Sequence, residues 1–115
     1  MIHDLSKIEI YIKPGKTDMR KQVNGLVVII QSQMKKTPQS GSLFLFCNRQ
    51  RKLLRGIYWD RNGFCLWQKR LEKHKFPWPD TEEEVKNISL EELDLLLKGI
   101  DFFKAHKELK FQELY

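Results

Sequence analysis

The chain has 115 residues, of which 41% are hydrophobic and 31% charged, a size that suits one domain around a single core. Its mean hydropathy is −0.53, and no apolar run approaches the ~20 residues needed to cross a bilayer, which excludes a transmembrane helix. No secretory signal is visible either, so we expect a cytoplasmic protein. Two cysteines and three scattered histidines form neither a disulfide scaffold nor a zinc motif, and we expect no metal and no cofactor.

The charges are unevenly spread along the chain. Lysine and arginine outnumber aspartate and glutamate by 21 to 15, which gives a net charge of +6 and a pI near 9.4. Residues 41–75 hold nine basic and two acidic side chains, whereas residues 76–115 hold five basic and ten acidic ones. A basic middle beside an acidic end favours a surface that binds a polyanion, and the alternative is that both are solvated faces.

The first predicted element is a short strand, because polar and apolar residues alternate over residues 7–12. Pro14-Gly15 ends this strand. Apolar residues then recur at spacings of three and four, which predicts an amphipathic helix from Asp18 to Met34. Either Thr17 or Asp18 could cap its N-terminus.

Three runs rich in Leu, Phe, Ile, Tyr and Trp follow, at residues 43–47, 52–59 and 64–71, and polar turns separate them. This pattern predicts three strands of an antiparallel β-meander. The second turn ends in Asn62-Gly63, a pair that tolerates the positive φ of a tight hairpin.

The last third of the sequence begins with an acidic run at residues 80–84 and continues with a capping-box pattern, Ser89 and Glu92. The pattern predicts a short helix over residues 89–98. We expect a single domain over residues 1–104 and a loosely held tail over residues 105–115, which lacks a secure cap. The predicted fold is α+β, an antiparallel β-meander sheet with one long amphipathic helix packed on it and a shorter C-terminal helix.

Catalysis is not indicated by any constellation of residues. Asp18 and Asp60 are the acidic residues most expected to be fixed in position by the fold. Asp18 precedes a predicted helix and Asp60 opens a turn, and short carboxylates at such places ordinarily accept hydrogen bonds from backbone N–H groups. Residues 14–17, Pro-Gly-Lys-Thr, match only the end of a P-loop and lack its upstream glycine. We therefore predict that the chain is not an enzyme.

Basic side chains gather in the turn at residues 49–52 and on the strands beside it. Arginine forks bind phosphate in two-point geometry, and nearby aromatic rings could stack on unpaired bases. We predict that nucleic acid binds to nine residues, namely Arg20, Arg49, Arg51, Lys52, Arg55, Arg61, Lys69, Arg70 and Lys73.

Several runs of sequence carry a family resemblance when taken in order: residues 15–21, 40–44, 46–49 and 58–67. Over roughly residues 10–99 the chain resembles the TnpB-type accessory protein, the second reading-frame product, of the insertion-sequence-66 transposon family. The resemblance implies a small protein without catalytic activity of its own, which assists the DNA recombination that moves a mobile genetic element. It also implies a separate, element-encoded transposase as a partner.

Three function hypotheses stand at this stage. The first is a non-catalytic accessory protein that binds DNA, or the transposase–DNA complex, through a basic β-hairpin surface. The second is a protein–protein adaptor whose acidic helix and tail contact the transposase without touching DNA. The third and least favoured is a nuclease. The strandedness and sequence of the DNA and the oligomeric state stay open.

Overall fold

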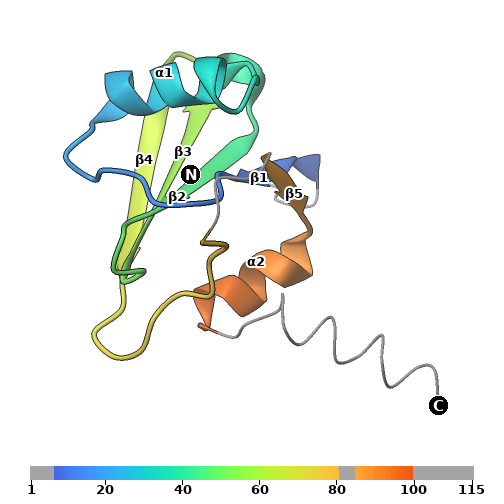
Figure 1. Cartoon of the computed structure of the whole chain (residues 1–115). Helices are drawn as coiled ribbons and strands as arrows, with labels where there is room; N and C mark the ends of the chain where they lie inside the picture. Colours follow the sequence, from blue (N-terminus) through green and yellow to red (C-terminus); the bar gives the residue numbers. More distant parts are fainter. Residues whose placement is uncertain (1–6, 81–84, 100–115) are drawn as a thin grey trace.

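The computed structural model of the chain describes residues 7–80 and 85–99. These residues form an α+β domain with one five-stranded sheet in the order β4-β3-β2-β1-β5 (Figure 1). The elements in chain order are β1 (Ile10–Ile12), α1 (Val23–Ser32), the 3-10 turn η2 (Pro38–Ser40), β2 (Leu43–Cys47), β3 (Leu53–Asp60), β4 (Gly63–Arg70), β5 (Lys86–Ile88) and α2 (Leu90–Leu97).

The sheet is mixed, so the expectation of a purely antiparallel meander is wrong for the sheet as a whole. Strands β2, β3 and β4 pair antiparallel in succession, but β1 runs parallel to β2, with Ile10 opposite Leu43. A parallel pair needs a long crossover connection, and the segment that contains α1 supplies it. Strand β5, which the sequence pattern did not indicate, pairs antiparallel with the other side of β1.

Helix α1 is shorter than the predicted helix from Asp18 to Met34. It begins at Val23, and its N-cap residue Gln22 provides no side-chain hydrogen bond. The Asp18 carboxylate is instead used locally, because its Oδ1 accepts a hydrogen bond of 2.9 Å from the backbone N–H of Arg20. The carboxylate expected to cap the helix therefore holds the turn that precedes it.

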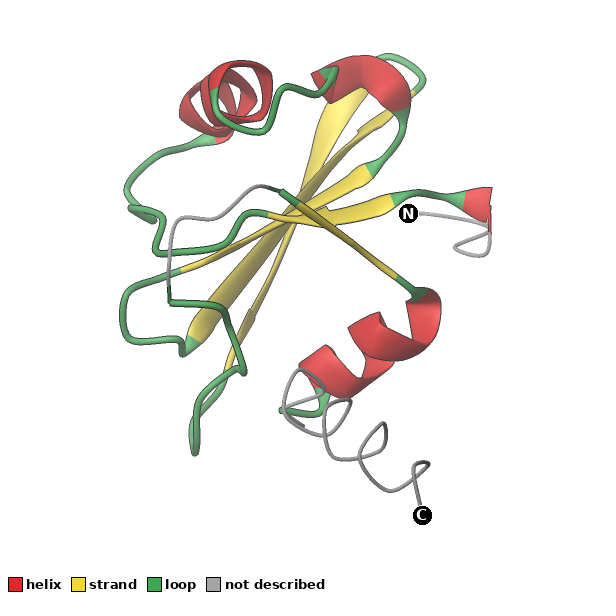
Figure 2. Ribbon diagram, turned by 45° about the vertical axis from the view of Figure 1, so that its right-hand side comes forward, coloured by secondary structure: helices red, strands yellow, loops and turns green. Residues whose placement is uncertain are grey.

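The two helices cover opposite faces of the sheet (Figure 2). Successive strand residues point to opposite faces, so each strand contributes to both layers of the core. Strand β2 lies in the middle of the sheet, and all five of its residues are buried. The α2 layer of the core is built mainly on Ile10, Ile12, Leu43, Leu45, Leu54, Phe76, Trp78, Leu93 and Leu96. The α1 layer is built on Leu26, Ile29, Ile30, Met34, Phe44, Phe46 and Ile57.

The start of α2 carries the predicted capping box. The Ser89 hydroxyl accepts a hydrogen bond of 3.1 Å from the backbone N–H of Glu92, and the Ser89 N–H donates one of 2.9 Å to the Glu92 carboxylate. The helix ends before Gly99, whose φ of 77° suits a glycine C-cap. The predicted tail at residues 105–115, and with it the proposed domain boundary, lies outside the described residues.

The β3–β4 hairpin turns differently from the sequence expectation. Arg61 adopts the left-handed φ of 57°, and neither Asn62 nor Gly63 has a positive φ. The backbone N–H of Asn62 donates to the carbonyl of Asp60 at 2.6 Å, and Asp60 lies opposite Gly63, so the turn keeps its expected place with its positive φ at Arg61. Within residues 7–80 and 85–99, no helix has the length and apolar character that a membrane span requires.

Candidate nucleic-acid interface

The turn between β2 and β3 is held rigidly by its first residue. The side-chain oxygen of Asn48 accepts hydrogen bonds from the backbone N–H groups of Lys52 and Leu53, at 3.0 and 3.1 Å. The Asn48 carbonyl accepts another from the N–H of Arg51 at 3.0 Å, and Arg51 takes a left-handed φ of 61°. This arrangement projects Arg49 and Lys52 into solvent.

A second loop packs beside this turn and adds a cation that the predicted set did not include. The N–H of Thr17 donates to the Cys47 carbonyl at 2.8 Å, which ties the loop at residues 13–17 to the end of β2. The loop turns at Gly15, where φ is 81°, and leaves Lys16 exposed. The Pro-Gly-Lys-Thr run is the signal that could have identified Lys16.

The segment after β4 closes the site from the other side. The indole Nε1–H of Trp78 donates to the carbonyls of Lys13 and Gly15, at 3.0 and 3.1 Å. The N–H of Gly15 in turn donates to the Pro79 carbonyl at 2.9 Å, and Arg51 forms an ion pair with Asp80. Because Trp78 is 5% exposed, it serves as a structural floor and does not offer a free face for stacking.

These three segments line a cavity of about 270 Å³ that is open to solvent. Its lining combines three cations and one carboxylate with small and apolar groups: Gly15, Lys16, Asn48, Arg49, Arg51, Trp78, Pro79 and Asp80. Such a surplus of cations around a concave surface attracts an anion, and a guanidinium beside an ammonium is suited to phosphate oxygens.

Lys73 belongs to the same end of the sheet. It lies exposed in the loop after β4, and this loop is fastened at both ends to the β2–β3 turn. The N–H of Leu71 donates to the Lys52 carbonyl at 2.8 Å, and the N–H of Phe76 donates to the Arg51 carbonyl. We call the cations gathered here the basic end, which consists of Lys16, Arg49, Arg51, Lys52 and Lys73.

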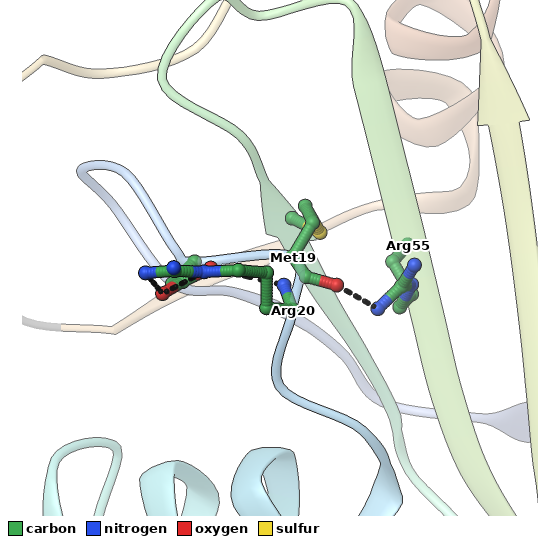
Figure 3. Close-up of polar contacts among 4 residues, drawn as sticks. Met19, Arg20 and Arg55 are labelled. Atoms are coloured by element: carbon green, nitrogen blue, oxygen red, sulfur yellow. Dashed lines mark hydrogen bonds and ion pairs between the residues drawn. The ribbon is translucent and has the colours of Figure 1, made fainter.

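Arg55, in contrast, is used inside the fold. Its Nη1 donates a hydrogen bond of 3.0 Å to the carbonyl of Met19 (Figure 3). The same Nη1 donates one of 3.0 Å to the carbonyl of Lys21, and Nη2 donates one of 2.9 Å to the side chain of Gln68. These contacts clamp the segment before α1 onto the middle of the sheet. The donors of the guanidinium are therefore occupied by these contacts, and Arg55 is poorly placed to bind a DNA phosphate.

Lys69 is also engaged in a structural contact. Its Nζ donates a hydrogen bond of 2.7 Å to the carbonyl of Leu97, in the last turn of α2. A lysine at this position compensates the partial negative charge of the helix C-terminus.

Arg20 and Arg70 are exposed but each has an acidic neighbour. The Arg20 guanidinium grips the Asp18 carboxylate through Nε at 3.1 Å and Nη2 at 2.7 Å (Figure 3). Side-chain and backbone hydrogen bonds from Arg20 lower the pKa of Asp18 from 3.8 to about 2. Arg70 pairs with Glu72 at 2.9 Å. Both arginines could reach a phosphate only in competition with these carboxylates.

Arg61 lies at the far end of the sheet. It sits in the turn after β3, and the eight residues of that strand separate it from the basic end by roughly 25 Å at ~3.3 Å per residue. Of the nine predicted residues, the structure thus brings Arg49, Arg51, Lys52 and Lys73 together and leaves Arg61 apart.

The groups that could support catalysis are few. Within the described part of the chain, no cluster of three or more His, Cys, Asp or Glu side chains could hold a metal ion. Cys47 is fully buried, and burial raises the pKa of its thiol to about 12, so the thiolate is scarcely populated at neutral pH.

Comparison with known proteins decides the family. The profile described as IS66 Orf2-like protein matches residues 8–107. The chain belongs to this IS66 Orf2-like family. It is 37% identical over 102 residues to the uncharacterized protein y4hO of Sinorhizobium fredii, with 89% of each chain covered. It is 32% identical over 108 residues to the uncharacterized protein y4jC of the same organism, with 94% of this chain and 92% of the relative covered. No solved structure matches significantly.

Membership of the IS66 Orf2-like family identifies the chain as a transposition-associated accessory protein. The family is not known as a catalytic one. The resemblance inferred from the sequence is therefore confirmed.

Proposed function

We propose that this accessory protein binds the phosphate backbone of DNA through its basic end and so assists the transposase of its element on DNA. The cavity lined by Lys16, Arg49 and Arg51 carries the proposal, since it unites three cations from two loops that are far apart in the sequence. Contacts to phosphates orient a protein on DNA without reading its sequence. This role suits a protein that accompanies a transposase, which would supply the sequence recognition.

The ion pair between Arg51 and Asp80 sets a limit on the affinity of the cavity for anions. An incoming phosphate must share Arg51 with the carboxylate of Asp80, whereas Lys16, Arg49 and Lys52 have no acidic partner within the described residues. We therefore assign the larger part of the phosphate attraction to those three side chains. They are also exposed, so their replacement leaves the core intact.

The test is a salt series of DNA affinities for the wild-type chain and a variant with Lys16, Arg49 and Lys52 all replaced by Gln. We expect weaker binding and a slope of log affinity against log salt that is smaller by up to about three, because each phosphate contact contributes roughly 0.9 to the slope. Equal affinity and equal slope for the two proteins would contradict the proposal.

A matched control removes the same number of charges elsewhere. The control replaces three exposed cations away from the basic end by Gln, namely Lys21, Lys35 and Arg61. We expect this variant to keep the wild-type salt slope. If both triple variants lose affinity equally, net charge alone governs DNA binding, and the basic end is not a specific DNA-binding site. If the wild type and its variants do not bind DNA in this series but do bind the transposase, the protein is an adaptor.

A further inference from the structure

Strand β4 forms an outer edge of the described sheet, since it pairs only with β3. The phase of its ladder follows from the hydrogen bond between the Leu71 N–H and the Lys52 carbonyl. Alternate pairs of an antiparallel ladder are hydrogen-bonded, so the N–H and C=O groups of Cys65, Trp67 and Lys69 point toward β3. Those of Phe64, Leu66, Gln68 and Arg70 therefore point outward, as a row of donors and acceptors that no strand of the described residues pairs.

The middle of this edge is apolar on both faces of the sheet. Leu66 is 45% exposed and Trp67 is 41% exposed. Leu66 lies opposite Ile57, on the α1 face. Trp67 lies opposite Gly56, beside Leu45 of the α2 layer. Proline and charged side chains keep exposed edge strands from pairing with other strands. Residues 63–68 contain neither.

We propose that β4 is a dimerisation edge, at which a second copy of this chain adds its own β4 antiparallel and joins two sheets into one. The charge pattern of the strand favours its own copy as the partner. A two-fold axis perpendicular to the sheet keeps the α1 faces of both copies on the same side. Pairing around such an axis places either Leu66 opposite Leu66 or Trp67 opposite Trp67 of the second copy. Lys69 then lies opposite Gly63 or Cys65 of the second copy, and no cation lies opposite another cation.

The pairing has a consequence for the basic end. Because the two β4 strands run antiparallel, the two basic ends of the dimer point in opposite directions. Strand β4 is eight residues long, so they lie at least roughly 20 Å apart at ~3.3 Å per residue. The dimer would thus offer two separate phosphate-binding sites related by two-fold symmetry. The inference itself rests on the β4 edge and holds whether or not the basic end binds DNA.

Sedimentation velocity of the full chain over a wide concentration range tests the proposal. We expect the wild type to associate reversibly from its monomer mass of 13.8 kDa to twice that mass. Leu66→Lys should raise the dimer dissociation constant about tenfold or more, because it puts a charge into an apolar contact and, in the pairing centred on Leu66, sets two cations opposite each other. Trp67→Lys tests the same edge from the opposite face and decides the question if Leu66→Lys fails to fold.

Val28→Lys is the matched control, since Val28 is an apolar residue that is 57% exposed and belongs to helix α1, outside the β4 strand. It should dimerise as the wild type does. A wild type that stays monomeric at all concentrations would overturn the proposal. So would dimers that survive both Leu66→Lys and Trp67→Lys, or that Val28→Lys weakens equally.

Discussion

At the scale of single residues, arginines that lie close together in the sequence have different roles. Arg49 and Arg55 lie six positions apart, and both belonged to the predicted nucleic-acid-binding set. The structure exposes Arg49 in a turn, whereas Arg55 holds two backbone carbonyls and Gln68. The contacts of Arg55 link residues up to 36 positions apart, and no local sequence pattern indicates such a contact. Sequence reasoning could locate the basic region but could not separate its structural cations from its free ones.

Replacing each of these two arginines by Gln distinguishes the roles. Arg55→Gln should lower the free energy of unfolding by about 2 kcal/mol, because it removes charge-assisted hydrogen bonds to the carbonyls of Met19 and Lys21. Arg49→Gln should change it by no more than about 0.5 kcal/mol, as is usual for exposed residues. Urea unfolding measures both values. Equal losses of stability in the two variants would show that Arg55 is not a clamp.

The pair of Asp18 and Arg20 predicts a change of stability in acid. The folded-state pKa of Asp18 is about 2, below its ordinary value of 3.8. As the pH falls from near 3.8 toward 2, the unfolded chain takes up this proton first, so the contribution of Asp18 to stability is lost in that window. Above pH 3.8 the contribution is fully present.

Melting temperatures measured against pH for the wild type and Asp18→Asn test this expectation. Asp18→Asn should melt lower than the wild type near neutral pH, and the difference should shrink between pH 4 and pH 2. A difference that is constant over this range would mean that the carboxylate has an ordinary pKa.

At the scale of the elements, the correct predictions rest on local patterns. Ser89 and Glu92 are three residues apart, and the capping box they predict is present. The predicted start of α1 was wrong because Asp18 could either cap a helix or accept a hydrogen bond from Arg20 in a turn. The spacing of the apolar residues could not decide between these two roles. Strand β5 was missed because three residues, Lys86–Ile88, are too few to show an alternation.

Strand packing explains why a glycine lies in the middle of β3. A Cβ atom placed on Gly56 would lie 3.1 Å from Leu45 Cδ2 and 3.3 Å from Leu43 Cδ1, and both leucines are buried in the central strand β2. Gly56→Ala should therefore lower the free energy of unfolding by about 1 kcal/mol, since overpacking outweighs the entropic gain of alanine.

Gly63→Ala is the control for that substitution. A Cβ atom on Gly63 would have no neighbour within 4 Å, and the backbone there has no positive φ. We expect Gly63→Ala to be neutral or slightly stabilising in the same urea titration. If Gly56→Ala proves as stable as Gly63→Ala, the leucines can move aside and the close contact is not a constraint.

At the scale of the whole molecule, the unpredicted features come from contacts between distant segments. The α+β class followed from helical and strand-like periodicities along the chain. The parallel pairing of β1 with β2 did not, because Ile10 and Leu43 are separated by a helix and a loop. The same holds for the cavity of the basic end. Lys16, Arg49 and Asp80 meet there only because three connections return to one end of the sheet.

The most direct measurement of the central claim is a nuclear magnetic resonance titration of the ¹⁵N-labelled chain with duplex DNA. We expect the largest amide shifts at residues 15–17, 48–52 and 71–75, the segments that carry the cations of the basic end, and we expect these shifts to disappear at high salt. The turn at Arg61, at the far end of β3, should not respond. Shifts confined to α2 or to the Arg61 turn, or no shifts at low salt, would contradict the account.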